Sequence, residues 1–226
     1  MDRTDYDLII FDCDGTLVDS EYPNNLSLVQ ILAEHGFDGY DMDYALKHWV
    51  GRTLTNIFKE LEEKDGHQFP DDIIKRCIER TNLLYETELK SVPDALDVVK
   101  RVSVNHKICV ASNGERNSVK RSLSLSGYGA DIFHEDNTFT RIQVPNGKPA
   151  PDLFLFAAEK MQAEPSRCLV IEDSPTGVQA AVAAGMSVWG FTGVAHNPPL
   201  QNELLEKTGA SQVFDRLIHI AERLGH

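Results

Sequence analysis

Short runs of consecutive apolar residues, each followed by polar residues, recur along the chain. The three clearest runs cover residues 8–11, 108–111 and 169–171, and two further candidates cover 187–191 and 212–214. Continuous Val, Ile and Leu runs of this length are typical of strands that are buried on both faces. The pattern therefore predicts a parallel β-sheet.

Helical patterns lie between these runs from about residue 93 onward. Pro93, Pro151 and Pro175 each stand where a proline suits the first turn of a helix, and Asn117 or Ser118 is predicted to cap another. Strands that alternate with helices predict an α/β fold, with a Rossmann-like core around the parallel sheet.

The segment from about residue 20 to residue 88 shows amphipathic helical patterns and no clear strand. Each of three helices is expected to present one apolar face, formed by Leu26, Val29 and Leu32, by Leu54, Ile57, Phe58 and Leu61, and by Ile73, Ile74, Cys77 and Ile78. We expect an α-helical cap at 18–92, inserted into a core formed by 1–17 and 93–226.

Charge and composition exclude several classes of protein. The 226 residues include 22 Lys and Arg against 35 Asp and Glu, a formal net charge of −13, which opposes binding to nucleic acid or to anionic membranes. No apolar run approaches the roughly 18 residues that a membrane span requires. The four cysteines form no Cys-x-x-Cys pair, which favours reduced thiols in a cytoplasmic protein. We expect a monomer or a weak homodimer.

Polar side chains follow three of the predicted strands directly. They are Asp12 and Asp14, Ser112 and Asn113, and Glu172 and Asp173. Because ligands of open parallel sheets bind beyond the carboxyl ends of the strands, these groups are expected to converge. Several carboxylates close together call for a cation, and oxygen ligands favour Mg²⁺.

Each of these segments also has a purely structural interpretation. The sequence Asp-Cys-Asp-Gly at 12–15 is typical of a tight turn, and Asp173 or Ser174 can cap the following helix. Residues 112–114 form either a loop with a helix cap or a cradle for an anion. Lys148 is either a solvated charge or, since Pro149 and Pro151 restrict the chain after it, a cation directed at the carboxylates.

The order and spacing of these segments resemble the haloacid dehalogenase-like (HAD) hydrolase superfamily. Residues 12–21, DCDGTLVDSE, resemble its first motif, Ser112-Asn113 its second, Lys148 its third and residues 172–174 its fourth. The helical insert resembles the cap of the β-phosphoglucomutase-like subgroup, which contains many phosphatases of small sugar and polyol phosphates.

The resemblance implies a role for each carboxylate. Asp12 would be the nucleophile that forms an aspartyl-phosphate, and Asp14 would be the general acid and then the base. Mg²⁺ would bind Asp12, the backbone carbonyl of Asp14, and Asp173, with Glu172 as a direct or outer ligand.

The same resemblance implies the contacts to the phosphoryl group. Thr16 and Ser112 would hold its oxygens, with help from the backbone N–H groups of Asn113 and Gly114. Lys148 would stabilise both the nucleophile and the phosphate. Since phosphoester cleavage needs a proton donor and Asp14 can be one, phosphatase activity is favoured over carbon–halogen chemistry.

Arg52, between two predicted cap helices, is the candidate contact to the rest of the substrate. It could bind a hydroxyl or a carboxylate, or it could be a solvated arginine beside a helix cap at Thr53. The first interpretation favours a sugar-acid phosphate such as 6-phosphogluconate among small sugar, sugar-acid and polyol phosphates.

Two other functions stay open. A β-phosphoglucomutase-like mutase is disfavoured because Asn24 stands about where those enzymes carry a histidine. A non-catalytic phospho-receiver shares the charge pattern, but its acidic pair precedes the nucleophile and it lacks a helical insert.

Overall fold

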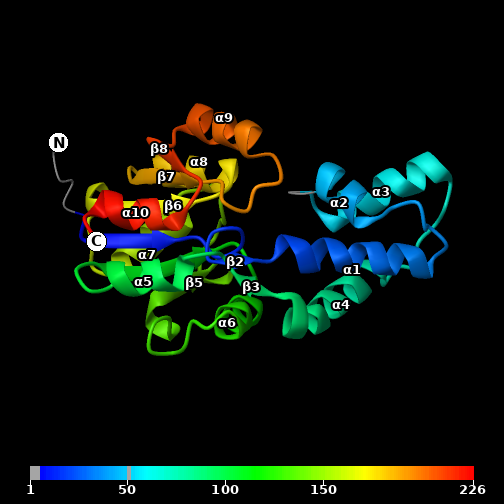
Figure 1. Cartoon of the computed structure of the whole chain (residues 1–226), viewed down its shortest axis with the longest axis horizontal. Helices are drawn as coiled ribbons and strands as arrows, with labels where there is room; N and C mark the ends of the chain where they lie inside the picture. The colour runs from blue at the N-terminus through cyan, green and yellow to red at the C-terminus, as the bar shows by residue number, and fades with distance from the viewer. Residues whose placement is uncertain (1–5, 50–51) are drawn as a thin grey trace. The chain divides into compact units, whose positions relative to one another are not determined.

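The structure is a computed structural model that describes residues 6–49 and 52–226. The described chain forms two compact units (Figure 1). One is an α/β core, made of the residues up to Asp19 together with Lys90–His226, and the other is the helical unit Ser20–Leu89.

A six-stranded parallel sheet forms the centre of the core, as the apolar runs predicted. Its strand order is β5-β4-β1-β6-β7-β8. The strands are β1 (Leu8–Phe11), β4 (Lys107–Ser112), β5 (Thr138–Thr140), β6 (Cys168–Glu172), β7 (Ser187–Phe191) and β8 (Gln212–Phe214). Because Phe11 pairs with Val110 on one side and Ile171 on the other, the polar residues after β1, β4 and β6 come to the same edge.

Helices pack on both faces of the sheet. Leu8 and Ile10 point into a cluster with apolar residues of α7 and α8, while α5 and α10 pack against each other on the opposite side (Figure 1). The core helices are α5 (Ala95–Val102), α6 (Arg116–Leu125), α7 (Asp152–Lys160), α8 (Pro175–Ala183), α9 (Pro198–Thr208) and α10 (Leu217–Leu224). Short 3₁₀ turns cover Glu135–Asn137, Arg141–Gln143 and Pro165–Arg167.

The cap of α6 differs from the prediction. Its N-cap is Glu115, whose carboxylate accepts the N–H groups of Asn117 and Ser118 at 2.9 and 3.1 Å. Asn117 and Ser118 are therefore capped residues of the first turn and not the cap. An acidic cap also suits the positive end of the helix dipole.

The helical unit buries a slightly different face of its first helix than we predicted. In α1 (Glu21–Glu34), Leu28, Ile31 and Leu32 join the apolar cluster of the unit, whereas Leu26 is only half-buried. The apolar pattern did not reveal this face because polar residues are also buried on it. Ser27 is fully buried, and its hydroxyl donates to a backbone carbonyl of α4 at 2.7 Å. The other helices are α2 (Met42–His48), α3 (Leu54–Asp65) and α4 (Ile73–Glu88), and Ile78 of α4 is 52% exposed instead of buried.

Two short strands carry the chain out of the core and back. Strands β2 (Val18–Asp19) and β3 (Lys90–Ser91) pair antiparallel, and the N–H of Val92 donates to the carbonyl of Leu17 at 3.0 Å. These contacts place residues 18–19 and 90–92 in the core, although the sequence assigned them to the cap.

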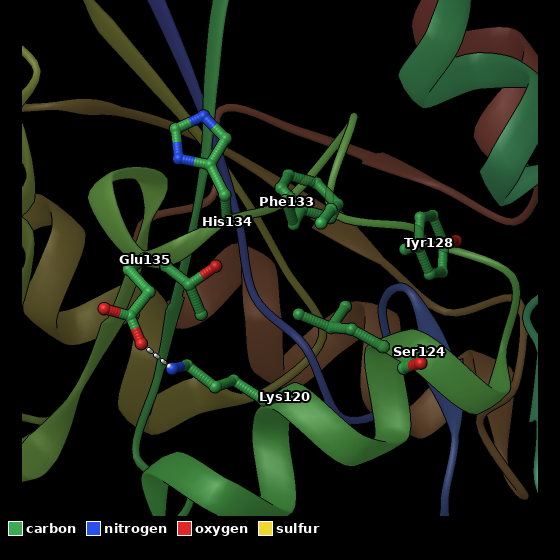
Figure 2. Close-up of a pocket in the computed structure, with 9 residues that line it drawn as sticks. Lys120, Ser124, Tyr128, Phe133, His134 and Glu135 are labelled. Carbon is green, nitrogen blue, oxygen red and sulfur yellow. Dashed lines mark hydrogen bonds and ion pairs between the residues drawn. The ribbon is translucent and has the colours of Figure 1, made fainter.

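A pocket of about 270 Å³ opens between α6 and the segment that leads to β5 (Figure 2). Tyr128, Phe133 and Leu123 supply apolar parts of its lining, and the ion pair of Lys120 with Glu135 lies beside them. None of its lining residues is a predicted site residue. Across the described chain, all four cysteines are buried and free, and no helix combines the length and apolarity needed to cross a membrane.

Candidate functional site

The backbone turns back on itself immediately after β1. The carbonyl of Cys13 accepts the N–H groups of Leu17 and Val18 at 2.9 and 3.0 Å, and the N–H of Gly15 donates to Val18 at 2.8 Å. Gly15 has a φ of 84°, a left-handed conformation that glycine adopts without strain. The predicted tight turn is therefore present and is compatible with the functional interpretation, because it returns Asp14 and Thr16 toward the end of β1.

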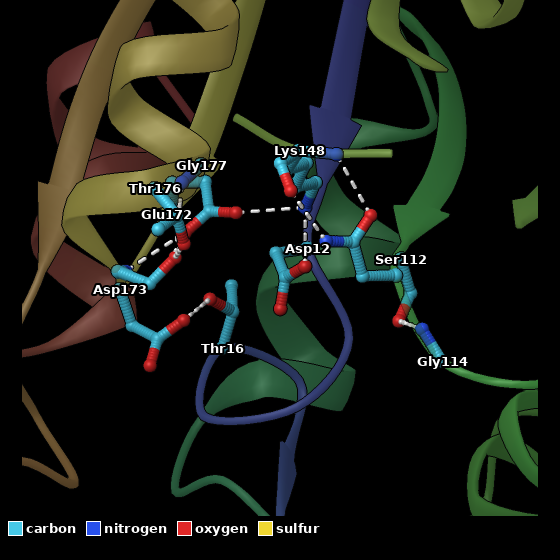
Figure 3. A network of polar contacts seen from close by, with 11 residues as sticks. Asp12, Thr16, Ser112, Gly114, Lys148, Glu172, Asp173, Thr176 and Gly177 are labelled. Atoms are coloured by element: carbon cyan, nitrogen blue, oxygen red, sulfur yellow. Dashed lines mark hydrogen bonds and ion pairs between the residues drawn. The ribbon is translucent and has the colours of Figure 1, made fainter. Parts of the chain in front are cut away.

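Lys148 connects two of the strand ends. Its Nζ donates to Oδ1 of Asp12 at 2.5 Å and to Oε1 of Glu172 at 2.7 Å (Figure 3). The Lys148 side chain is only 3% exposed, and its Nζ lies 4.8 Å from the centre of the Phe154 ring. The solvated alternative for this lysine is thus wrong, and the contact with Phe154 had no signal in the sequence.

Asn113 holds the backbone of Lys148 from both sides. Its amide nitrogen donates to the Lys148 carbonyl, and its amide oxygen accepts the Lys148 N–H, both at 2.9 Å. The side chain of Asn113 therefore positions the lysine, a role that sequence reasoning missed. The N–H of Gly114 donates to Oγ of Ser112 at 3.0 Å, which leaves the Ser112 hydroxyl proton available to another acceptor.

Glu172 is held at both carboxylate oxygens. Oε1 accepts from Lys148, and Oε2 accepts from the N–H and hydroxyl of Ser174 at 2.8 and 2.9 Å. Ser174 in turn caps α8 by accepting the N–H of Gly177 at 3.1 Å. A β-carbon at Gly177 would lie 1.6 Å from Oε1, so any larger residue there displaces this carboxylate.

Asp173 faces the turn that follows β1. The hydroxyl of Thr16 donates to Oδ1 of Asp173 at 3.4 Å, and a β-carbon at Gly15 would lie 2.2 Å from Oδ2. The side-chain amide of Gln201 in α9 donates to the backbone carbonyl of Asp173. Sequence reasoning missed Gln201, because nothing in its neighbourhood marks a residue that reaches another loop.

Burial and the neighbouring charges together set the pKa values of these groups. Burial raises the pKa of Asp12 to about 8, with Lys148 opposing the rise and Glu172 adding to it. Burial and the charges of Glu172 and Asp12 raise the pKa of Asp173 far above its usual range. Burial alone would lower the pKa of Lys148, but the two neighbouring carboxylates outweigh it and keep the ammonium charged.

The donor set fits a hard divalent cation that keeps part of its water. Three carboxylates face one ammonium, so the site carries an excess of negative charge that protons or a cation must offset. In the described chain no residue donates to Oδ2 of Asp12, and Asp173 lies on the next strand end. Within residues 6–49 and 52–226, no group of three or more acidic, histidine or cysteine side chains is placed so that it could hold a metal ion by itself. Water and backbone oxygens would have to complete the ligand shell, which is usual for Mg²⁺.

Arg52 belongs to the helical unit and carries an ion pair there. Its Nη2 lies 2.5 Å from Oε2 of Glu60, and Thr53 caps α3 by accepting the N–H of Asn56 at 3.3 Å. Gly51, which precedes Arg52, lies outside the described residues. In the same unit Asn24 accepts the hydroxyl of Tyr85 at 3.2 Å.

Comparison with known proteins gives consistent matches. The model of the haloacid dehalogenase-like hydrolase family matches residues 6–185. A 6-phosphogluconate phosphatase from Escherichia coli (strain K12) is 28% identical over 198 residues, 85% of each chain. A fructose-1-phosphate phosphatase from the same strain is 30% identical over 180 residues, 79% of this chain and 92% of its own. A HAD family hydrolase from Deinococcus radiodurans R1, crystallised with bound phosphate and sodium, has a TM-score of 0.83, 27% identity and 97% coverage of both chains.

Proposed function

Because the chain belongs to the haloacid dehalogenase-like hydrolase family and its relatives include named phosphatases, we propose that this phosphatase hydrolyses a small phosphomonoester with Mg²⁺, through an aspartyl-phosphate on Asp12. The observation that carries the proposal is the bridge from Lys148 to Asp12 and Glu172. It fixes one oxygen of Asp12 and orients the carboxylate at the strand ends as a nucleophile.

The reaction then runs in two displacements. The Asp12 carboxylate attacks phosphorus, the bond to the ester oxygen breaks, and Asp14 donates a proton to the leaving oxygen. Asp14 next accepts a proton from water, and the oxygen of that water attacks phosphorus and releases Asp12. Inorganic phosphate and an alcohol are the products.

Charge stabilisation would come from groups at the ends of β1 and β6 and from Lys148. The Asp12 and Asp173 carboxylates and the Asp14 carbonyl would hold Mg²⁺, which supplies positive charge to the transferring phosphoryl group. Glu172 is the weaker candidate ligand, since both of its oxygens already accept hydrogen bonds. The ammonium of Lys148 would stabilise the negative charge of Asp12 and of the bound phosphate.

Small polar groups of the core would bind the phosphoryl oxygens. We propose the hydroxyl of Ser112 and the backbone N–H of Asn113 for this role. Thr16 and the N–H of Gly114 can join them by exchanging their present partners, Asp173 and Ser112, for phosphate.

The substrate is proposed to be a small sugar, sugar-acid or polyol phosphate, and not a nucleic acid or a lipid. Relatives named for 6-phosphogluconate and fructose 1-phosphate support this class. The net charge of −13 opposes polyanionic partners, and the free, buried cysteines support a cytoplasmic location. Release of inorganic phosphate without an isomerised sugar phosphate would separate hydrolysis from mutase activity.

Removal of divalent cations is expected to abolish turnover of every ester in a panel of small phosphate esters. The reason is that the three carboxylates face a single ammonium, so without a cation they either repel a phosphate dianion or stay protonated, and a protonated Asp12 is a poor nucleophile. The measurement is phosphate release after treatment with EDTA and again after addition of Mg²⁺. Full activity without any divalent cation would contradict the proposed site. If the protein with Mg²⁺ takes up one phosphate and then does not turn over, the non-catalytic phospho-receiver is favoured instead.

Arg52→Ala is expected to lower kcat/KM for the best sugar-acid ester more than for p-nitrophenyl phosphate, because only the former offers a carboxylate. The matched control is Glu60→Ala, which breaks the same ion pair and leaves the guanidinium in place. A loss in Arg52→Ala that Glu60→Ala reproduces, or an equal loss for both esters, would reduce Arg52 to a structural role.

A further inference from the structure

Tyr128, two residues beyond the cap of the α6 C-terminus, reaches both chain segments that link the core to the helical unit. Its hydroxyl donates to the carbonyl of Leu17 at 3.2 Å and lies 3.2 Å from Oγ of Ser91. Leu17 precedes β2, and Ser91 ends β3. One side chain, only 2% exposed, therefore ties the outgoing segment to the returning one.

The hydrogen-bond directions are consistent at this junction. The carbonyl of Leu17 accepts both the Val92 N–H and the Tyr128 hydroxyl, which uses its two lone pairs. The single proton of the Ser91 hydroxyl then has two acceptors within reach, the Tyr128 oxygen at 3.2 Å and the Val92 carbonyl at 3.3 Å. Burial raises the pKa of Tyr128, so its hydroxyl keeps the proton that it donates at any ordinary working pH.

The ring of Tyr128 is almost fully buried and lies at the edge of a pocket. Phe133 packs against it, with ring centres 5.6 Å apart, but the ring also lines the pocket of about 270 Å³ (Figure 2). The two hydroxyl contacts act together with this packing to hold the ring in place. A second contact from α6 supports the same turn, because Oγ of Ser122 lies 3.9 Å from Sγ of Cys13.

The anchored carbonyl belongs to the turn that bears Asp14. The N–H of Leu17 donates to Cys13 at 2.9 Å, so a displacement of Leu17 is passed to the residues on either side of Asp14. Neither Asp12, which follows β1, nor Lys148 has a hydrogen bond or ion pair with Tyr128. Tyr128 can thus affect the turn while the nucleophile and its lysine stay in place.

We propose that Tyr128 is a positioning residue for the general acid. By anchoring Leu17, its hydroxyl holds the turn 13–18 in the conformation from which Asp14 protonates the leaving oxygen. This inference rests on the proposed role of Asp14.

The leaving group provides the readout. An alkoxide leaves only with a proton, whereas p-nitrophenolate is stable without one, so a misplaced acid slows alkyl esters selectively. Tyr128→Phe removes the hydroxyl and keeps the ring. We expect kcat/KM for glycerol 3-phosphate to fall about tenfold and that for p-nitrophenyl phosphate to fall less than about twofold, in line with the loss of one hydrogen bond.

The experiment compares four proteins on the two esters. Asp14→Asn is the reference for loss of the acid, and Ser211→Ala is the structural control, because it deletes a hydroxyl bond to the Val188 carbonyl near the start of β7, away from the strand ends that form the site. We expect similar small decreases of the unfolding midpoint in Tyr128→Phe and Ser211→Ala, but a changed ester ratio only in the former.

The results distinguish the role proposed for Tyr128 from the role proposed for Asp14. A selective loss in both Asp14→Asn and Tyr128→Phe supports the inference. A selective loss in Asp14→Asn alone overturns the role of Tyr128 and leaves the proposed function intact. Absence of selectivity in Asp14→Asn overturns the acid itself, and the inference with it.

Discussion

Asp12→Asn is expected to lower kcat by roughly 10⁴-fold or more, because an amide cannot form the acyl-phosphate bond. The fold should survive, since Lys148 keeps Glu172 as a partner and the amide is close in size to the carboxylate. Initial rates of phosphate release, measured with the unfolding midpoint of the same preparation, check both statements. Beryllium fluoride bound on the Asp12 carboxylate of the unaltered protein would be direct support.

The matched control for this substitution is Asp97→Asn. Asp97 is an exposed carboxylate in α5 that pairs with Arg101 at 2.8 Å, outside the site. It should keep the full rate. A rate near that of the unaltered protein in Asp12→Asn, once deamidation is excluded by mass spectrometry, would remove Asp12 from the role of nucleophile.

Lys148→Met is expected to damage both catalysis and stability. Loss of the ammonium removes positive charge from nucleophile and phosphate, which typically lowers kcat/KM about 10²–10³-fold. It also leaves Asp12 and Glu172 buried without their counter-charge, which lowers the free energy of unfolding by about 3–5 kcal/mol near neutral pH. Denaturant unfolding and steady-state kinetics measure the two effects.

The stability deficit of Lys148→Met should depend on pH in a defined direction. A carboxyl with a pKa raised on folding binds more protons in the folded state, so it stabilises at low pH and loses that contribution as the pH rises through the folded pKa. The pKa of Asp12 is already about 8, and loss of Lys148 raises it further. The deficit, measured with EDTA, should therefore be larger at pH 8 than at pH 5. Lys107→Met, which removes an exposed ammonium bound to the Met161 carbonyl at 2.9 Å, is the control and should show neither effect. An equal deficit at both pH values would contradict the charge balance proposed for the site.

Local pattern was sufficient to predict the strands that have long apolar runs. Strands β1, β4 and β6 lie at the centre of the sheet, where burial on both faces demands continuous apolar residues. Strand β5 escaped prediction because it is a three-residue edge strand, Thr-Phe-Thr, without such a run. The two-residue strands β2 and β3 exist only because they pair with each other, which a linear pattern cannot reveal.

The candidate site likewise contains residues that the sequence could predict and contacts that it could not. Residues at strand ends, such as Asp12 and Glu172, could be predicted to converge because parallel strands share an edge. The supporting contacts could not, because they join residues distant in the chain: Asn113 to the backbone of Lys148, Gln201 to Asp173, and Tyr128 to Leu17. Such contacts depend on where loops meet in space and have no periodic signature in the sequence.

The paired strands β2 and β3 determine how readily the inserted helical unit can be replaced by another insert. Val18 faces Ser91 and Asp19 faces Lys90, so the helical unit leaves and re-enters the core at adjacent positions. The entire helical unit is therefore equivalent to one long loop that joins the two strands of the β2–β3 hairpin. The entropy lost on closing a loop grows only with the logarithm of its length, about 0.6 kcal/mol for each doubling. An insert of another length or another fold can therefore be exchanged at this junction with little effect on core stability, which leaves selectivity free to diverge while the chemistry is retained.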